Sequence, residues 1–145
     1  GNIPPHVRGP EAKKTFRSME KAIKAGLIRS CHDISDGGLA CALAESAFAG
    51  DIGVDVDLNK VPCEGVFRDD ILLFSESASR FVATIREKDL PAFEKIFKSI
   101  PCGVIGKVQA GKTFRIKGLR GDVIIDTNID YLKNAWQEPF KRIFG

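Results

Sequence analysis

The sequence lacks the features that mark several protein classes. No apolar stretch approaches the roughly 20 residues that a membrane-spanning helix needs, and no signal-peptide pattern opens the chain. No dense run of lysine and arginine occurs, and 22 basic against 19 acidic residues leave a formal net charge of only +3. Such a charge is too small to indicate a nucleic-acid partner. We therefore expect a soluble, cytoplasmic protein that binds neither nucleic acid nor a membrane.

Cysteine, histidine and methionine are also scarce. The four cysteines include no CxxC pair, so neither a zinc site nor a disulfide framework is indicated and we expect buried, reduced thiols. These cysteines are Cys31, Cys41, Cys63 and Cys102. The two histidines, His6 and His32, stand far apart, which argues against a multi-histidine metal site. The only methionine is Met19 and the chain starts at Gly1, which suggests a piece of a longer protein.

What the sequence does contain is typical of one compact domain. Its 145 residues are 43% hydrophobic and 28% charged, which is enough for a core without disulfides or a structural metal. Residues 1–10 include three prolines and two glycines and are expected to form an extended lead-in, so that the domain spans 11–145. This length is short for an ATP-dependent enzyme with separate nucleotide and substrate domains.

The spacing of apolar residues predicts helices and strands in mixed order. Repeats of three and four residues predict helices over 11–27, 39–50, 89–100 and 129–136. Alternation or short apolar runs predict strands over 29–34, 54–58, 71–74, 81–85, 104–108, 114–117 and 123–126. This order excludes an all-helical bundle and an all-β sandwich, and it predicts an α/β (α+β) fold with helices packed on a mixed sheet. Trp136 and the ten phenylalanines are expected in its core.

The segment 31–39 is the first place where chemistry can be located. A predicted strand ends in Asp33 and Ser35, and Gly37 and Gly38 then open a predicted helix. A helix N-terminus favours an anion, glycines allow a phosphate to approach the backbone, and a carboxylate can hold the magnesium that accompanies a nucleotide. The alternative is structural, because Ser and Asp are common helix-capping residues, and spacing alone favours a cap. His32 is interpreted as a packed or hydrogen-bonded histidine.

The second candidate is the polar stretch Ser75-Glu76-Ser77, which follows the apolar run 71–74. A carboxylate flanked by hydroxyls suits ribose or phosphate oxygens or a metal-bound water. The alternative is a turn in which Glu76 pairs with Arg80. The aspartates at 51, 55 and 57 are assigned to solvent, and no nucleophile is placed beside a base, so no catalytic residue is named.

Several short motifs follow one another along nearly the whole chain. They are 32–39 (HDISDGGL), 42–45 (ALAE), 73–77 (LFSES), 80–81 (RF), 105–108 (IGKV) and 132–136 (LKNAW). Taken together in this order, they resemble the last domain of the phosphoribosylformylglycinamidine synthases. These enzymes are the formylglycinamide ribonucleotide amidotransferases of purine biosynthesis, in the AIR synthase-related superfamily.

The resemblance implies a fold, a reaction and a set of ligands. The fold is a three-layer α/β/α domain with a mixed sheet, and the reaction is ATP-dependent formation of an amidine from formylglycinamide ribonucleotide and glutamine-derived ammonia. Asp33 would bind Mg²⁺, and Ser35, Gly37, Gly38 and Glu76 would contact a nucleotide such as ATP. The implied partners are the other domains of the synthetase, a glutaminase subunit or domain, and a small accessory subunit. The family's catalytic histidine and ATP-binding lysine lie outside this chain, so the chain alone is expected to be inactive.

Two alternatives stay open at this point. The family's first-half domain has a glutamine where this chain has Ala78, which puts a substrate role for Glu76 in doubt and fits the second half of the synthetase. The chain is alternatively a non-catalytic scaffold whose glycine turn is only a helix cap. It is also compatible with a related phosphotransferase such as thiamine-monophosphate kinase or selenophosphate synthetase, which share the fold with the hydrogenase maturation protein HypE.

Overall fold

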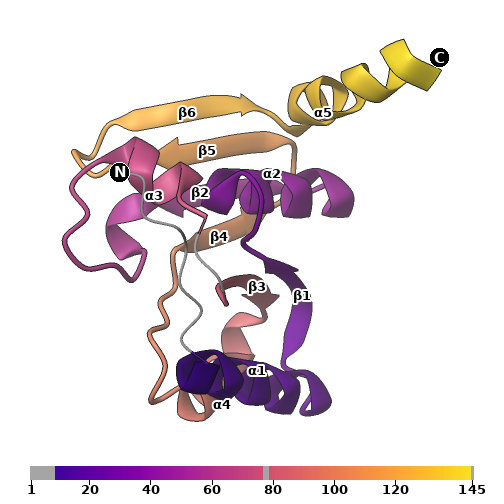
Figure 1. The fold of residues 1–145 in the computed structure, drawn as a ribbon. Helices are drawn as coiled ribbons and strands as arrows, with labels where there is room; N and C mark the ends of the chain where they lie inside the picture. Colours follow the sequence, from indigo (N-terminus) through magenta and orange to yellow (C-terminus); the bar gives the residue numbers. More distant parts are fainter. Residues whose placement is uncertain (1–8, 77–78, 145) are drawn as a thin grey trace.

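The computed structural model describes residues 9–76 and 79–144, and helices and strands alternate through them (Figure 1). Residues 1–8 of the predicted lead-in, Ser77, Ala78 and Gly145 lie outside the described residues, while Gly9 and Pro10, which were also predicted as lead-in, begin helix α1. The elements are α1 (Gly9–Lys24), β1 (Ile28–Asp33), α2 (Gly38–Gly50), β2 (Gly53–Asp57), the 3-10 helix η1 (Leu58–Lys60), α3 (Asp69–Phe74), β3 (Phe81–Ile85), the 3-10 helix η2 (Glu87–Asp89), α4 (Leu90–Ile96), β4 (Gly106–Gln109), β5 (Thr113–Lys117), β6 (Val123–Asn128) and α5 (Ile129–Phe144).

The strands form two sheets. β1 and β3 make an antiparallel pair, in which His32 lies opposite Val82. The other four strands form a sheet in the order β4-β2-β5-β6, in which β2 and β5 are parallel and the remaining neighbours are antiparallel. The predicted mixed direction of the sheet is therefore confirmed, while its division into two parts was not predicted.

Two apolar clusters hold the layers together. Cluster one joins α2, α3 and the start of α5 to the four-stranded sheet, and cluster two joins α1 and α4 to the β1–β3 pair. The β1–β3 pair thus has α1 and α4 on one face and α2 on the other, which is an α/β/α layering. The buried members of cluster one are Ile34, Leu39, Ala42, Leu43, Ala47, Val54, Val56, Leu58, Leu72, Leu73, Phe114, Ile116 and Ile129. Those of cluster two are Met19, Ala22, Phe93 and Phe97.

Helix α2 lies between the two sheets. Its apolar, alanine-rich composition allows it to be covered on several sides. The helix is apolar around most of its circumference, and its alanines pack in cluster one: Ala42 and Ala47 are buried members, and Ala40 and Ala44 pack against it. Small side chains let backbones approach closely, and a helix that is apolar all round is stable only when it is covered on several sides. This placement fixes the N-terminus of α2 at the end of β1.

Three sequence predictions differ from the structure. The run 71–74, predicted as a strand, is part of helix α3. The helix predicted over 89–100 ends at Ile96, and Asp89 does not cap it with its side chain. The last helix extends eight residues beyond the predicted end at Trp136. Several side chains expected inside are exposed: they are Trp136, Phe16, Phe67, Phe74 and Phe140, and the thiols of Cys31, Cys63 and Cys102.

The aspartates assigned to solvent have partners on the outer face of the four-stranded sheet. Asp55 lies opposite Lys107 on one side and Arg115 on the other, and Arg115 lies opposite Asp126, 3.5 Å from Arg115 Nη2 to Asp126 Oδ2. Charges therefore alternate across all four strands. Asp57 accepts the Asn59 N–H at 2.9 Å and so caps η1.

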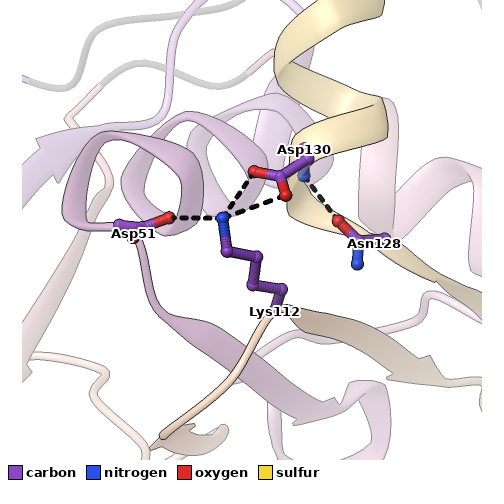
Figure 2. A network of polar contacts seen from close by, with 4 residues as sticks. All are labelled: Asp51, Lys112, Asn128 and Asp130. Carbon is purple, nitrogen blue, oxygen red and sulfur yellow. Dashed lines mark hydrogen bonds and ion pairs between the residues drawn. The ribbon is translucent and has the colours of Figure 1, made fainter.

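A polar network fixes the base of α5 (Figure 2). Lys112 donates to Asp130, in the first turn of α5, at 2.9 and 3.0 Å, and lies 3.3 Å from the carboxylate of Asp51, the C-cap residue of α2. The Asp130 N–H donates to the side chain of Asn128 at 2.8 Å. The Ile129 N–H donates to the Lys112 carbonyl at 2.9 Å. The start of α5 is thus bound to both the sheet and α2.

Candidate functional site

The turn between β1 and α2 is built on two glycines with left-handed backbone. Gly37, the N-cap residue of α2, has φ +79°, and Gly38 has φ +67°. The Gly38 N–H donates to the Ser35 carbonyl at 3.0 Å, which closes the turn through the backbone. Among the described residues, neither Ser35 nor Asp36 caps α2 with its side chain, and both are exposed. The structural alternative, in which Ser35 or Asp36 caps the helix with its side chain, is therefore wrong.

Gly38 is required by the close approach of α3. A Cβ atom on Gly38 would lie 2.6 Å from the Leu73 carbonyl oxygen and 2.8 and 2.9 Å from backbone carbons of Phe74. Real Cβ atoms do not approach backbone atoms so closely, and a left-handed φ is itself unfavourable for residues with a side chain. The missing side chain lets the end of α3 lie directly against the start of α2. The sequence correctly marked Gly38 as a special position. The structure shows that the close packing of α3 is one reason why a glycine is needed there.

The approach of α3 brings Glu76 to the N-terminus of α2. The Gly37 N–H donates to Glu76 Oε1 at 2.9 Å, which joins two segments separated by 39 residues. A carboxylate at a helix N-terminus is stabilised by the positive end of the helix dipole and by the unpaired N–H groups there. The two candidate motifs therefore form one site. Arg80, proposed as the partner of Glu76, donates to the Ser75 carbonyl at 2.5 Å.

The groups around this contact are held in place by neighbouring side chains. His32 Nε2 lies 3.0 Å from the Glu45 carboxylate on α2, and Nδ1 lies 3.0 Å from the Asp33 carbonyl oxygen. His32 is therefore a hydrogen-bonded residue that links β1 to α2, as predicted. Burial, with smaller contributions from the charges of Glu45 and Glu76, raises the pKa of Cys41, so its thiol stays protonated near neutral pH. Desolvation lowers the pKa of Arg80.

The site residues fit a metal only when a ligand supplies the other donors. Asp33 is exposed at the end of β1, next to the turn. Among residues 9–76 and 79–144, no group of three or more His, Cys, Asp or Glu side chains could hold a metal ion. Mg²⁺ commonly uses one or two protein carboxylates together with phosphate oxygens and waters. The donor set therefore suits Mg²⁺ bound to a phosphate and does not suit a structural metal held by the protein alone.

The sequence found the members of the site but not the contact between them. Glycine and carboxylate signals identified Asp33, Ser35, Gly37, Gly38 and Glu76, and the structure places all five at the turn or in contact with it. The Glu45 contact to His32 was missed, although Glu45 was part of the motif series. Within the part of the chain that the structure describes, none of the helices is long and apolar enough to cross a membrane.

The fold and the site together define a class of protein: a mixed α/β domain whose glycine turn holds a carboxylate at a helix N-terminus. The chain belongs to the family described as AIR synthase related protein, C-terminal domain, whose model matches residues 5–118. The matched region covers the candidate site and ends before β6 and α5.

Curated relatives extend the similarity to the whole chain. Subunit PurL of phosphoribosylformylglycinamidine synthase from Deinococcus radiodurans is 34% identical over 145 residues, which is 100% of this chain and 19% of that protein. The protein of the same name from Thermococcus sibiricus is 42% identical over 106 residues, covering 73% of this chain and 15% of that protein. The chain thus spans about a fifth or less of the length of these relatives.

Solved structures confirm the fold. The structure of PurLQS from Thermotoga maritima matches with a TM-score of 0.80 and 21% identity, over 90% of this chain and 23% of that chain. Thermotoga maritima PurL complexed with ATP matches with a TM-score of 0.78 and 22% identity, over 88% of this chain and 22% of that chain. The predicted α/β fold with a mixed sheet, of the AIR synthase-related C-terminal type, is therefore confirmed.

Proposed function

We propose that this chain is the second-half C-terminal domain of a phosphoribosylformylglycinamidine synthase. In that enzyme it would form one wall of a nucleotide site during the ATP-dependent conversion of formylglycinamide ribonucleotide and ammonia to the amidine. The proposal is supported by relatives of that name that align with the chain over its whole length. The chain itself supplies no catalytic residue, and an assay of the chain alone with ATP, substrate and ammonia is expected to give no turnover.

The observation that carries the proposal is the hydrogen bond from the Gly37 N–H to Glu76 Oε1 at 2.9 Å. This hydrogen bond brings the glycine turn and the segment of Glu76 together. Asp33 and Ser35 are exposed beside the turn, and neither side chain caps α2. An exposed carboxylate and an exposed hydroxyl next to a helix N-terminus are groups that bind a metal–phosphate ligand.

The charge of Glu76 makes a bare phosphate unsuitable for this turn. The carboxylate already accepts one N–H of the turn, and a phosphate next to it would meet a like charge at close range. We propose that Asp33 holds Mg²⁺ and that the Ser35 hydroxyl and the Gly37–Gly38 backbone orient the nucleotide. When bound, Mg²⁺ neutralises phosphate charge. Glu76 would position the turn.

The test is the number of nucleotides bound by the full-length synthetase. Equilibrium binding of ATP with Mg²⁺ is expected to show one equivalent fewer per chain in Asp33→Asn than in the parent protein, and binding at this site is expected to require Mg²⁺. Asp122→Asn is the matched control, because Asp122 is also an exposed aspartate but lies in the turn between β5 and β6. Unchanged stoichiometry in both Asp33→Asn and Ser35→Ala would favour the alternative, a non-catalytic scaffold domain.

The partners belong to the same proposal. We propose that the other domains of the synthetase, a glutaminase subunit or domain and a small accessory subunit assemble with this domain in the cytoplasm. The structure of PurLQS from Thermotoga maritima, which has the same fold over this region, supports an assembly of this kind. Copurification of the full-length synthetase with a glutaminase, followed by glutamine-dependent turnover, tests it.

A further inference from the structure

Helix α5 carries an apolar stripe along its whole length. The spacings of three and four residues place its members on one face of the helix. The members, which we call the α5 stripe, are Ile129, Leu132, Trp136, Phe140 and Ile143. Tyr131 lies on the opposite face, about 200° from Ile129 at 100° per residue.

Only the first half of the α5 stripe is covered by the described residues. Ile129 is 1% exposed and Leu132 packs against cluster one. Trp136 contacts Phe48 at the end of α2, with ring centroids 5.7 Å apart, but remains 51% exposed. Phe140 is 55% and Ile143 72% exposed. The outer half of the α5 stripe therefore extends the apolar surface of cluster one, but none of the described residues buries it.

The base of α5, from which the exposed half projects, is also held in a fixed direction. The Lys112 network binds the first turn of α5 to α2 and to the β4–β5 turn (Figure 2). Beyond that base, α5 extends past the rest of the chain toward the C-terminus (Figure 1). A rigid base and a projecting apolar face are a preorganised binding element, because little conformational entropy remains to be lost when the face is covered.

Helix α5 is shared with long relatives and lies outside the family model. The family model ends at residue 118, before α5 begins, whereas the relative that aligns over all 145 residues is about five times longer than this chain. Helix α5 therefore lies outside the region shared by the whole family and inside the region shared with long, multidomain synthetases.

We propose that the outer half of the α5 stripe docks against an apolar face of another domain of the same polypeptide. This inference rests on the proposed function, because it requires the chain to be part of the longer synthetase. Taking roughly 150–250 Å² for a large side chain, Trp136, Phe140 and Ile143 offer about 350 Å² of exposed surface. A stable dimer needs about 800 Å² per partner. A tethered domain needs much less, because the polypeptide connection holds the two faces at a high effective concentration.

The test is cysteine accessibility in the full-length synthetase. Phe140→Cys and, separately, Ile143→Cys are treated with a maleimide, and Tyr131→Cys is the control because Tyr131 is 69% exposed on the opposite face of the same helix. Labelling is measured peptide by peptide with mass spectrometry, since Cys31, Cys63 and Cys102 are also exposed in this domain. We expect positions 140 and 143 to react at least about tenfold more slowly than position 131, at every protein concentration.

Each other labelling outcome overturns the docking proposal. Equal rates at all three positions would show that nothing covers the stripe. Protection that grows with protein concentration, together with a dimer in sedimentation, would identify a second copy as the occupant. Protection that appears only after addition of the glutaminase subunit would identify that subunit. ATP-dependent turnover is measured on the same samples: a variant that turns over normally but labels freely refutes the docking alone, and a protected protein without turnover refutes the proposed function alone.

Discussion

Gly38 and Gly65 have nearly the same positive φ, +67° and +66°, but different surroundings. A Cβ on Gly38 would meet backbone atoms of Leu73 and Phe74 at 2.6 to 2.9 Å, whereas a Cβ on Gly65 would meet nothing within 4 Å. The pair therefore separates the cost of a left-handed backbone from the cost of blocking the approach of α3 to α2.

Replacing these glycines by alanine tests that separation. Gly65→Ala is expected to lower the free energy of unfolding by about 1 kcal/mol, from backbone strain alone. Gly38→Ala adds a clash with backbone that has little freedom to move, so a loss of about 3 kcal/mol or more is expected. Urea unfolding followed by the fluorescence of Trp136, the single tryptophan, measures both. Equal losses for the two variants would show that α3 adjusts without cost.

Asp57 provides a prediction about acid. The hydrogen bond from the Asn59 N–H holds the pKa of the Asp57 carboxyl below its ordinary value of 3.8, with smaller contributions from Lys117 and Lys60. A lowered folded pKa means that the cap stabilises the protein fully above the ordinary pKa and that the contribution is lost as the pH falls through the folded value. Asp57→Asn removes the titration and keeps an acceptor oxygen. The stability advantage of the parent over Asp57→Asn is therefore expected to shrink below about pH 4 in urea unfolding, and a constant difference from pH 6 to pH 2 would contradict this.

At the scale of elements, the attachment of α5 depends on one cation. Hydrogen bonding to Asp130, followed by that to Asp51, raises the pKa of the Lys112 ammonium above 10.5. The folded pKa is the higher one, so the network stabilises the protein fully below the ordinary pKa and is lost as the pH rises through the folded value. All three groups are largely exposed, so salt screens their interaction.

Lys112→Met is expected to lower the melting temperature at neutral pH and low salt, and to lower it less in about 1 M NaCl. The difference from the parent protein is also expected to narrow above about pH 10.5. Lys133→Met is the control, since Lys133 is an exposed lysine on the same helix that receives the network. Equal shifts in both variants, or a shift that salt does not reduce, would contradict the network's role.

The sequence predicted most elements, and the exceptions have physical reasons. The run 71–74 reads equally as a strand or as one turn of helix, since four apolar residues carry no period. The structure selects the helix because Leu72 and Leu73 pack into cluster one while Asp69, in the first turn, accepts the Leu119 N–H at 2.7 Å. Leu119 is 50 residues away, so no local pattern contains that information.

The candidate site was predictable in its members and not in its geometry. Residue types and spacing identified Asp33, Ser35 and the glycines, but Ser35 and Asp36 were equally typical of a helix cap. The structure decides against the cap because the side chains of Ser35 and Asp36 are exposed, and the contact of Glu76 with the turn depends on how closely α3 approaches α2. The distance between α3 and α2 depends on the packing of α3 against Gly38. This is a tertiary contact, and the sequence alone shows only that a glycine stands at this position.

At the scale of the whole molecule, the two apolar clusters are unequal. Within residues 9–76 and 79–144, cluster one has thirteen buried side chains and cluster two has four. Because stability scales with buried apolar surface, the unit of α1, α4 and the β1–β3 pair is expected to open at a lower free energy than the four-stranded sheet.

Native-state hydrogen exchange of the chain measures this difference. Amides in the middle of α1 and α4 are expected to exchange at least about tenfold faster than those of β2 and β5, where Val56 and Ile116 are at most 2% exposed. Ala22 in the last turn of α1 and Val56 in β2 are matched reporters, since both are fully or nearly fully buried. Uniform protection across both units would show instead that the β1–β3 pair couples the clusters into one cooperative core.

The bond between Gly37 and Glu76 also orders events during synthesis. The two residues are 39 positions apart, and a ribosome adds about 5 to 20 residues each second. Each nascent chain therefore passes about 2 to 8 s in which the glycine turn has been translated and its glutamate has not. During that interval the start of α2 lacks the carboxylate that later occupies it, and the mature turn is completed only when a segment made much later folds back onto it.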